Sequence, residues 1–167
     1  MDHDAKIKAL HDAILNSSIE LEQAFFDDWG LWYSLSLTEV ALLVDEAAIH
    51  LVDASISDDY LGGTYTARIA IFTERLLVTV EADVSPETQS HKTSARSRSD
   101  LKGLAIAAEV GALGGQHGAA AWPGRVHLTL DYGDGETLVL PGGRHAKREQ
   151  HAAVAASLPS LRVDLTA

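Results

Sequence analysis

Two groups of basic residues are the parts of this sequence best suited to bind an anion. The first group recurs at even spacings along an alternating, strand-like segment and consists of Lys92, Arg96, Arg98 and Lys102. The second group lies at the start of the last predicted helix, where free backbone N–H groups also favour anions, and consists of Arg144, Lys147 and Arg148. Such side chains suit a small anion, an anionic lipid headgroup or an acidic peptide. The alternative interpretation is a solvated surface that balances nearby acids.

Catalytic and metal-binding patterns are absent from the sequence. It has no G-x-S-x-G turn, no G-x-x-x-x-G-K-[ST] loop and no H-E-x-x-H pair, and it has no cysteine. Asp131, Asp134 and Glu136 resemble a calcium loop, but the segment lacks the length and the terminal glutamate of one. We therefore expect no enzyme activity, no metal and no cofactor. A hydrolase assembled from dispersed histidines and aspartates is a third hypothesis.

The acidic residues are concentrated at the front of the chain. Residues 1–60 hold 13 of the 24 Asp and Glu residues and only two bases, Lys6 and Lys8, so they carry the whole net charge of −11. Residues 61–167 are neutral. An acidic surface repels phosphates and anionic lipids, so we expect no nucleic-acid partner and no membrane partner. The acidic front is instead suited to dock on the basic strand of its own or a neighbouring subunit.

Length and composition indicate a globular protein. The chain has 167 residues, of which 46% are hydrophobic and 22% charged, as in an ordinary domain. Its start is acidic and lacks the apolar run of a signal peptide, and no apolar stretch reaches the roughly 18–20 residues that a membrane span needs. We therefore expect a cytoplasmic protein.

Residues 4–29 predict one long helix, capped by Asp2 or Asp4 and ended at Gly30. Its apolar stripe consists of Ile7, Leu10, Ile14, Leu21 and Phe25. The stripe either packs on the rest of the domain or, because it is close to heptad spacing, binds a partner or a second copy. Five aromatic residues fall within nine positions: Phe25, Phe26, Trp29, Trp32 and Tyr33. Such a cluster anchors a helix to its domain or, if exposed, forms a binding hot spot.

The remainder predicts an antiparallel β domain with a helical turn before it and a helix at its end. The segments are a helical turn at 37–45, strands at 46–57, 65–72, 75–84, 91–101 and 104–110, a loop at 111–124, a hairpin at 126–131 and 136–140, and a helix that Pro159 ends. The segment 104–110 also fits a helix. Beyond Pro159, the tail either adds a short strand or frays. The fold class is therefore α+β, with five to seven antiparallel strands.

The order of these strands resembles that of the bacterial PH-like domains. Thr73, Arg75 and Leu76-Leu77 match a strand that ends in Thr, an Arg-bearing turn and a second apolar strand. The resemblance covers residues 42–158 and implies a barrel or sandwich closed by the C-terminal helix. It divides the chain into an acidic helix with an aromatic linker (1–35) and a PH-like β domain (36–167).

PH-like domains are binding or assembly modules, some for phosphoinositides and many for proteins. In lipid-binding members the bases cluster near early strand loops, whereas the corresponding loops here carry Asp58-Asp59 and Glu74. We therefore predict a non-enzymatic module that acts through protein–protein contacts, as a homo-oligomer. The alternative is binding of an anionic lipid or a small anion at the basic groups.

Overall fold

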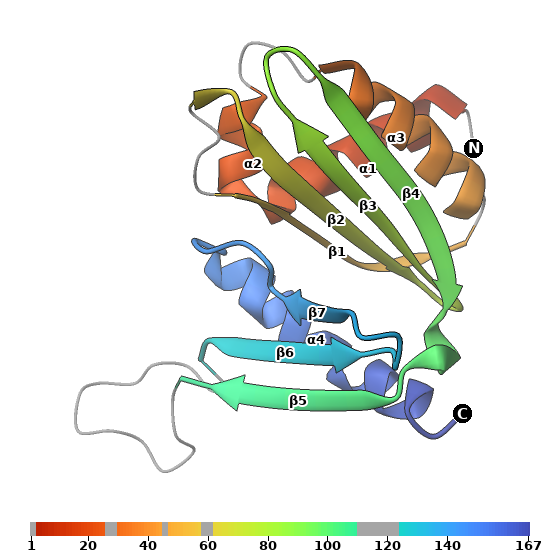
Figure 1. Cartoon of the computed structure of the whole chain (residues 1–167). Coiled ribbons are helices and arrows are strands. Elements are labelled where there is room, and N and C mark those ends of the chain that lie inside the picture. Colours follow the sequence, from red (N-terminus) through yellow and green to blue (C-terminus); the bar gives the residue numbers. More distant parts are fainter. Residues whose placement is uncertain (1–2, 26–29, 45–46, 58–61, 110–123) are drawn as a thin grey trace.

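The computed structural model describes residues 3–25, 30–44, 47–57, 62–109 and 124–167. In these residues seven strands form two separate antiparallel sheets (Figure 1). The four-stranded sheet runs in the order β1 (Ile49–Ile56), β2 (Tyr65–Thr73), β3 (Leu76–Val84) and β4 (Gln89–Ser97). The three-stranded sheet runs in the order β5 (Gly103–Ala108), β6 (Val126–Asp131) and β7 (Thr137–Leu140).

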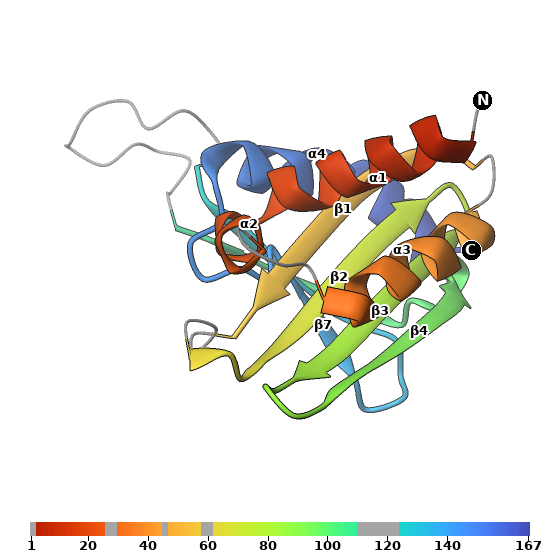
Figure 2. The same cartoon turned by 90° about the horizontal axis from the view of Figure 1, so that it is seen from above.

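Four α-helices cover these sheets in the described residues. They are α1 (His3–Ser17), α2 (Ile19–Ala24), α3 (Gly30–Val44) and α4 (Arg148–Asp164), and a short 3-10 turn, η2 (Arg98–Asp100), links the two sheets. Figure 2 shows α1 above β1 and α3 alongside β4. The three-stranded sheet and α4 lie on the other side of the four-stranded sheet (Figure 1).

Two hydrophobic cores follow from strand alternation, because successive side chains point to opposite faces of a sheet. On one face of β2 and β3, Ile69 and Val80 pack against Ile14 of α1 and Val40 of α3. On the other face, the described residues that pack against the three-stranded sheet and α4 include Phe72, Leu77, Leu128, Leu140 and Leu161. The four-stranded sheet is therefore the middle layer of the molecule.

The predicted α+β class with five to seven antiparallel strands is confirmed, including the β2–β3 pair, β5 as a strand, the β6–β7 hairpin and the C-terminal helix. The described strands form two sheets without a closed barrel. The strand predicted at 91–101 starts earlier and ends at Ser97, where Ser97 Oγ accepts from Ser99 N–H at 3.3 Å and starts η2. The predicted loop at 111–124 lies almost wholly outside the described residues.

The prediction of one long helix over 4–29 was wrong. The segment instead forms two helices, α1 and α2, which are separated at Ser18. The Ser18 backbone is extended, and its hydroxyl caps α2 by accepting the Leu21 N–H at 3.1 Å, as serine does at helix N-termini. Gly30, with φ of 70°, begins α3 instead of ending a helix. The boundary predicted at residue 35 therefore falls inside α3.

The C-terminal helix also extends further than predicted. Pro159 lies within α4, which continues to Asp164. Tertiary contacts hold the last turns of α4 in place, because Leu161 is buried in the core and Ser160 and Asp164 both bond to Arg98 of η2. Tertiary contacts here outweigh the local cost of proline. No helix among the described residues is long and apolar enough to cross a bilayer.

Candidate functional site

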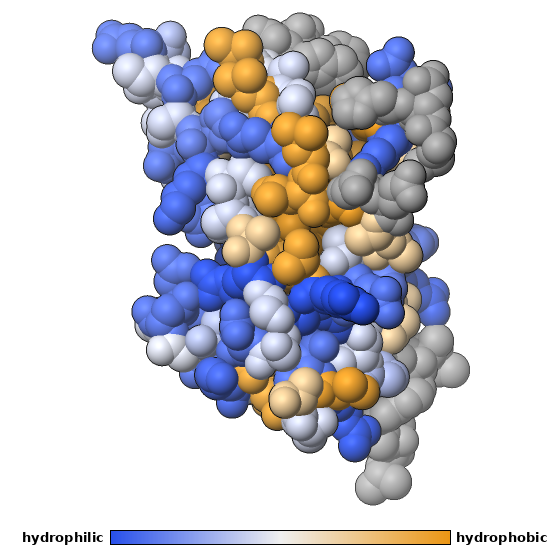
Figure 3. Space-filling view, turned by 90° about the vertical axis from the view of Figure 1, so that its right-hand side faces the viewer, coloured by the Kyte–Doolittle hydropathy of each residue, from blue (hydrophilic) through white to orange (hydrophobic). Residues whose placement is uncertain are grey.

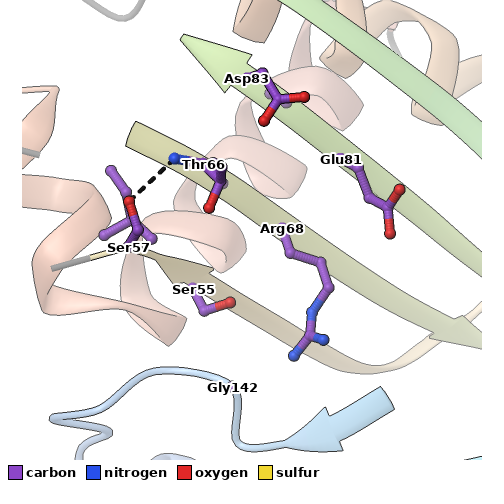
Figure 4. Close-up of a pocket in the computed structure, with 10 residues that line it drawn as sticks. Ser55, Ser57, Thr66, Arg68, Glu81, Asp83 and Gly142 are labelled. Carbon is purple, nitrogen blue, oxygen red and sulfur yellow. Dashed lines mark hydrogen bonds between the residues drawn. The ribbon is translucent and has the colours of Figure 1, made fainter. Parts of the chain in front are cut away.

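An open pocket of about 470 Å³ lies between the four-stranded sheet and the loop that follows β7. Figure 4 shows Ser55 from β1, Thr66 and Arg68 from β2, and Glu81 and Asp83 from β3 around it. These side chains share one face because the strands pair in register, with Arg68 opposite Glu81 and Thr66 opposite Asp83. A smaller pocket of about 220 Å³ shares Arg68 and Glu81 and extends toward Tyr132.

Arg68 connects the two sheets at this pocket. Its Nη2 donates to the Val139 carbonyl on β7 at 2.9 Å, and its guanidinium lies against the backbone of Gly142. Asp53, buried beneath the pocket, accepts from the Gly142 N–H and from Gln150 Nε2, both at 2.8 Å. Burial raises the pKa of Asp53, and these hydrogen bonds oppose the rise. The Asp53 contacts therefore fix the loop against which Arg68 packs.

The pocket is suited to a small polar molecule with both donors and acceptors. Arg68 supplies N–H donors, Ser55 and Thr66 supply hydroxyls, and Glu81 and Asp83 supply acceptors. The two carboxylates outnumber the one guanidinium in the lining, so the pocket offers no net attraction to an anion. It was not among the sites that the sequence predicted, because its residues come from distant segments.

The predicted basic group on β4 is divided by the fold. Lys92 and Arg96 lie on one face of β4, in register with Glu81 and Leu77 of β3. Arg96 bonds to Asp134 at 2.6 Å and Glu136 at 3.4 Å. Its guanidinium stands over Tyr132, whose pKa burial raises to about 12. Arg96 is therefore largely neutralised by the β6–β7 turn.

Arg98 is a core residue and does not join that group. Its side chain is 4% exposed and donates to Asp164 Oδ2 at 2.6 and 2.9 Å, to the Thr73 carbonyl and to Ser160. Lys102 lies beyond η2, with its N–H bonded to the Asp131 carbonyl. The even spacing predicted that all four basic residues share one face of a strand, but β4 ends at Ser97, before Arg98 and Lys102.

The second basic group stays near the surface. Arg144 and Arg148 are exposed and Lys147 is half-buried, at the entry to α4. The acidic front reaches this loop: Glu20 of α2 is buried and accepts from the His145 N–H at 3.0 Å. A second contact of the front, Glu39 of α3 with His91 of β4 at 3.1 Å, lies on the four-stranded sheet. Parts of the front therefore dock within the same chain.

The predicted helix interface is mostly inside the molecule. Four of its residues are buried in the first core, Leu10, Ile14, Leu21 and Phe25, and Ile7 is half-buried. The described part of the aromatic cluster is buried as well, with ring centroids of Phe25 and Tyr33 4.6 Å apart. Phe26 and Trp29 lie outside the described residues. The stripe thus packs on its own domain.

A different helix carries the exposed apolar face. Leu31, Leu35 and Leu42 of α3 are 69%, 45% and 70% exposed, and their spacings of four and seven place them on one side of the helix. We call these three residues the α3 leucine face. Figure 3 shows hydrophobic surface at the level of the helices and the four-stranded sheet, on the side where α3 ends. Because apolar residues occur all around α3, no clear period marked this face in the sequence.

Comparisons with protein-family models, with curated proteins and with solved structures find no match to this chain.

Proposed function

We propose that this chain is a non-enzymatic assembly module of PH-like architecture that binds a second copy of itself through the α3 leucine face. The PH-like part is supported by the order of the described strands, four in one antiparallel sheet and three in the next, followed by a C-terminal helix. The single observation that carries the binding part is the exposure of Leu31, Leu35 and Leu42. Large apolar residues that line up on a surface mark interaction sites.

The chemistry of the α3 leucine face favours a copy of the same chain. Its exposed neighbours on α3 are Ser34, Thr38 and Leu43, which carry no charge. Glu39, on the flank toward β4, bonds to His91 of its own chain. Among the described residues of α3, the leucine face of each chain can therefore meet its copy without bringing like charges into contact, although each chain carries a net charge of −11.

The spacing is also self-complementary. Leu31 and Leu42 lie equally far from a point between Ser36 and Leu37, and so do Leu35 and Thr38. A second α3 that packs antiparallel about a two-fold axis at that point sets Leu31 against Leu42 and Leu35 against Thr38. Such an isologous contact is the usual form of a homodimer.

Sedimentation velocity of the full chain over a wide concentration range tests the proposal. We expect a reversible dimer that persists at high salt, because the contact is apolar, and that Leu35→Glu or Leu42→Glu converts to monomer. Val163→Glu is the matched control, since Val163 is 65% exposed on α4, and it should leave the dimer intact. A wild-type chain that stays monomeric at the highest concentration, or a control that dissociates the dimer equally, would overturn the proposal.

A further inference from the structure

The outer edge of β4 is unpaired in the described residues and regular along its length. β4 is the last strand of its sheet, is nine residues long and pairs with β3 without a bulge. Proteins usually protect such edges with bulges, prolines or charged side chains, because free N–H and C=O groups invite another strand. The charged side chains of β4, Lys92 and Arg96, lie on the face toward the three-stranded sheet, away from α3.

The free backbone groups belong to alternate residues. Arg98 N–H donates to the Arg75 carbonyl, and Ser85 N–H donates to the Thr88 carbonyl at the other end of the β3–β4 pair. Antiparallel ladders alternate between hydrogen-bonded and non-hydrogen-bonded pairs. Even-numbered residues therefore bond to β3, and the N–H and C=O groups of Gln89, His91, Thr93, Ala95 and Ser97 point to the free edge.

Helix α3, which carries the leucine face, lies alongside this edge. Trp32 N–H contacts Gln89 Oε1 at 3.5 Å and Glu39 bonds to His91, so α3 runs beside β4 in the same direction, as Figure 2 shows. The symmetry point of the leucine face, between Ser36 and Leu37, falls between these two contacts and is therefore nearly level with His91. A two-fold axis through this position relates both α3 and β4 to their copies.

We infer that two copies join their β4 edges in the same dimer, antiparallel, with His91 on the two-fold axis. The inference rests on the proposed self-association and names its geometry. The axis is perpendicular to the sheet, so both α3 helices lie on one face, antiparallel, and the two four-stranded sheets become one continuous sheet. His91 then faces His91 of the second copy, and Gln89 faces Thr93 of the second copy, with the edge-facing N–H and C=O groups bonded across the seam.

This register is favoured by charge and by interface size. It sets Lys92 opposite Ser90 of the second copy, whereas a register shifted by two residues sets Lys92 against Lys92, and like charges opposite each other destabilise a sheet. Each His91 keeps its Glu39 partner. A standard interface contributes about 20–30 residues per partner. The leucine face is much smaller, so the strand edge supplies contact area that a lasting dimer needs.

Single cysteines test the register, because the chain has none of its own. The Cα atoms of a hydrogen-bonded antiparallel pair are about 5.5 Å apart, which is within the range of a disulfide. His91→Cys should form a covalent dimer on mild oxidation. Ala95→Cys is the control: it is also on the edge, but it lies four residues from the axis and should not cross-link.

A double variant covers the case in which His91→Cys disturbs the Glu39 contact. Gln89→Cys with Thr93→Cys should cross-link between copies, whereas either substitution alone should not. Two outcomes would overturn the joined edges and leave the proposed function standing. One is that Ala95→Cys cross-links as fast as the expected pairs. The other is that none of these variants cross-links although sedimentation shows a dimer. A monomer at all concentrations would overturn both.

Discussion

Arg98 and Asp164 form a buried ion pair that ties η2 to the last turn of α4. The Arg98 Nη2 to Asp164 Oδ2 distance is 2.6 Å, and the two side chains are 4% and 13% exposed. The remaining donors of Arg98 bond to the Thr73 carbonyl and to Ser160 Oγ, at 2.6 and 2.5 Å. One guanidinium therefore joins β2, η2 and α4.

Arg98→Ala should lower the free energy of unfolding by about 3–5 kcal/mol, because it leaves the Asp164 carboxylate half-buried without its partner. Urea denaturation checks this. Arg96→Ala is the control, since the Arg96 pairs with Asp134 and Glu136 are near the surface and should contribute no more than about 1 kcal/mol. Equal losses for both variants would contradict the assignment of Arg98 to the core.

Ile14→Ala should destabilise the monomer without changing the mass of the oligomer. Ile14 is 1% exposed in the first core, and truncation of a buried isoleucine costs about 2–5 kcal/mol. Ile7→Ala, at a half-buried position of the same helix, should cost clearly less. The measurements are thermal melting and sedimentation. Dissociation of a dimer by Ile14→Ala, with unchanged melting, would instead restore α1 as the interface.

Strand positions could be predicted from the sequence, and helix ends could not. β2 and β3 are rich in β-branched residues and flank a short turn, and this pattern predicts an antiparallel pair. At Ser18 and Pro159, the sequence alone does not show whether a helix ends or continues. Ser18 ends α1 and caps α2, whereas α4 continues past Pro159 because its last turn bonds to Arg98.

The candidate sites depended even more on tertiary contacts. Alternation correctly placed Lys92 and Arg96 on one face, but nothing in the spacing indicated that η2 would turn Arg98 into the core. Leu35 and Val40 are equally apolar in the sequence. Leu35 is exposed and Val40 is buried only because α1 and the sheet cover one side of α3. The pocket around Arg68 requires β1, β2, β3 and the loop at Gly142 to meet, which no local pattern encodes.

Gly142→Ala should disturb the pocket and lower stability. A Cβ at this position would lie 2.5 Å from Arg68 Nη2 and 2.9 Å from Ser55 Oγ, so the Arg68 side chain must move away from the Val139 carbonyl. Overpacking of this kind costs about 1–3 kcal/mol. Gly143→Ala is the matched control, because its Cβ would meet nothing closer than 3.7 Å. Chemical denaturation of the two variants should separate them; equal stability would show that the loop adjusts freely.

The contribution of Asp53 to the free energy of unfolding should fall as the pH rises above about 4. Burial raises the pKa of Asp53 from its ordinary 3.8, against the opposing hydrogen bonds from Gly142 and Gln150. Between the ordinary and the raised pKa, the folded chain binds the Asp53 proton more tightly than the unfolded chain does. The stability gained from that proton is full below the ordinary pKa and is lost as the pH rises through the raised pKa.

Asp53→Asn isolates this contribution from those of the other carboxylates. The difference in unfolding free energy, wild type minus Asp53→Asn, should fall as the pH rises from about 4 and level off above the raised pKa. Urea unfolding at a series of pH values measures it. The substituted side chain keeps an acceptor for the Gly142 N–H but presents an amide donor to Gln150, so the variant differs in absolute stability, and only the slope is diagnostic. A difference that is flat with pH, or that rises, would mean that the Asp53 carboxylate is not held in the low-polarity environment that its burial implies.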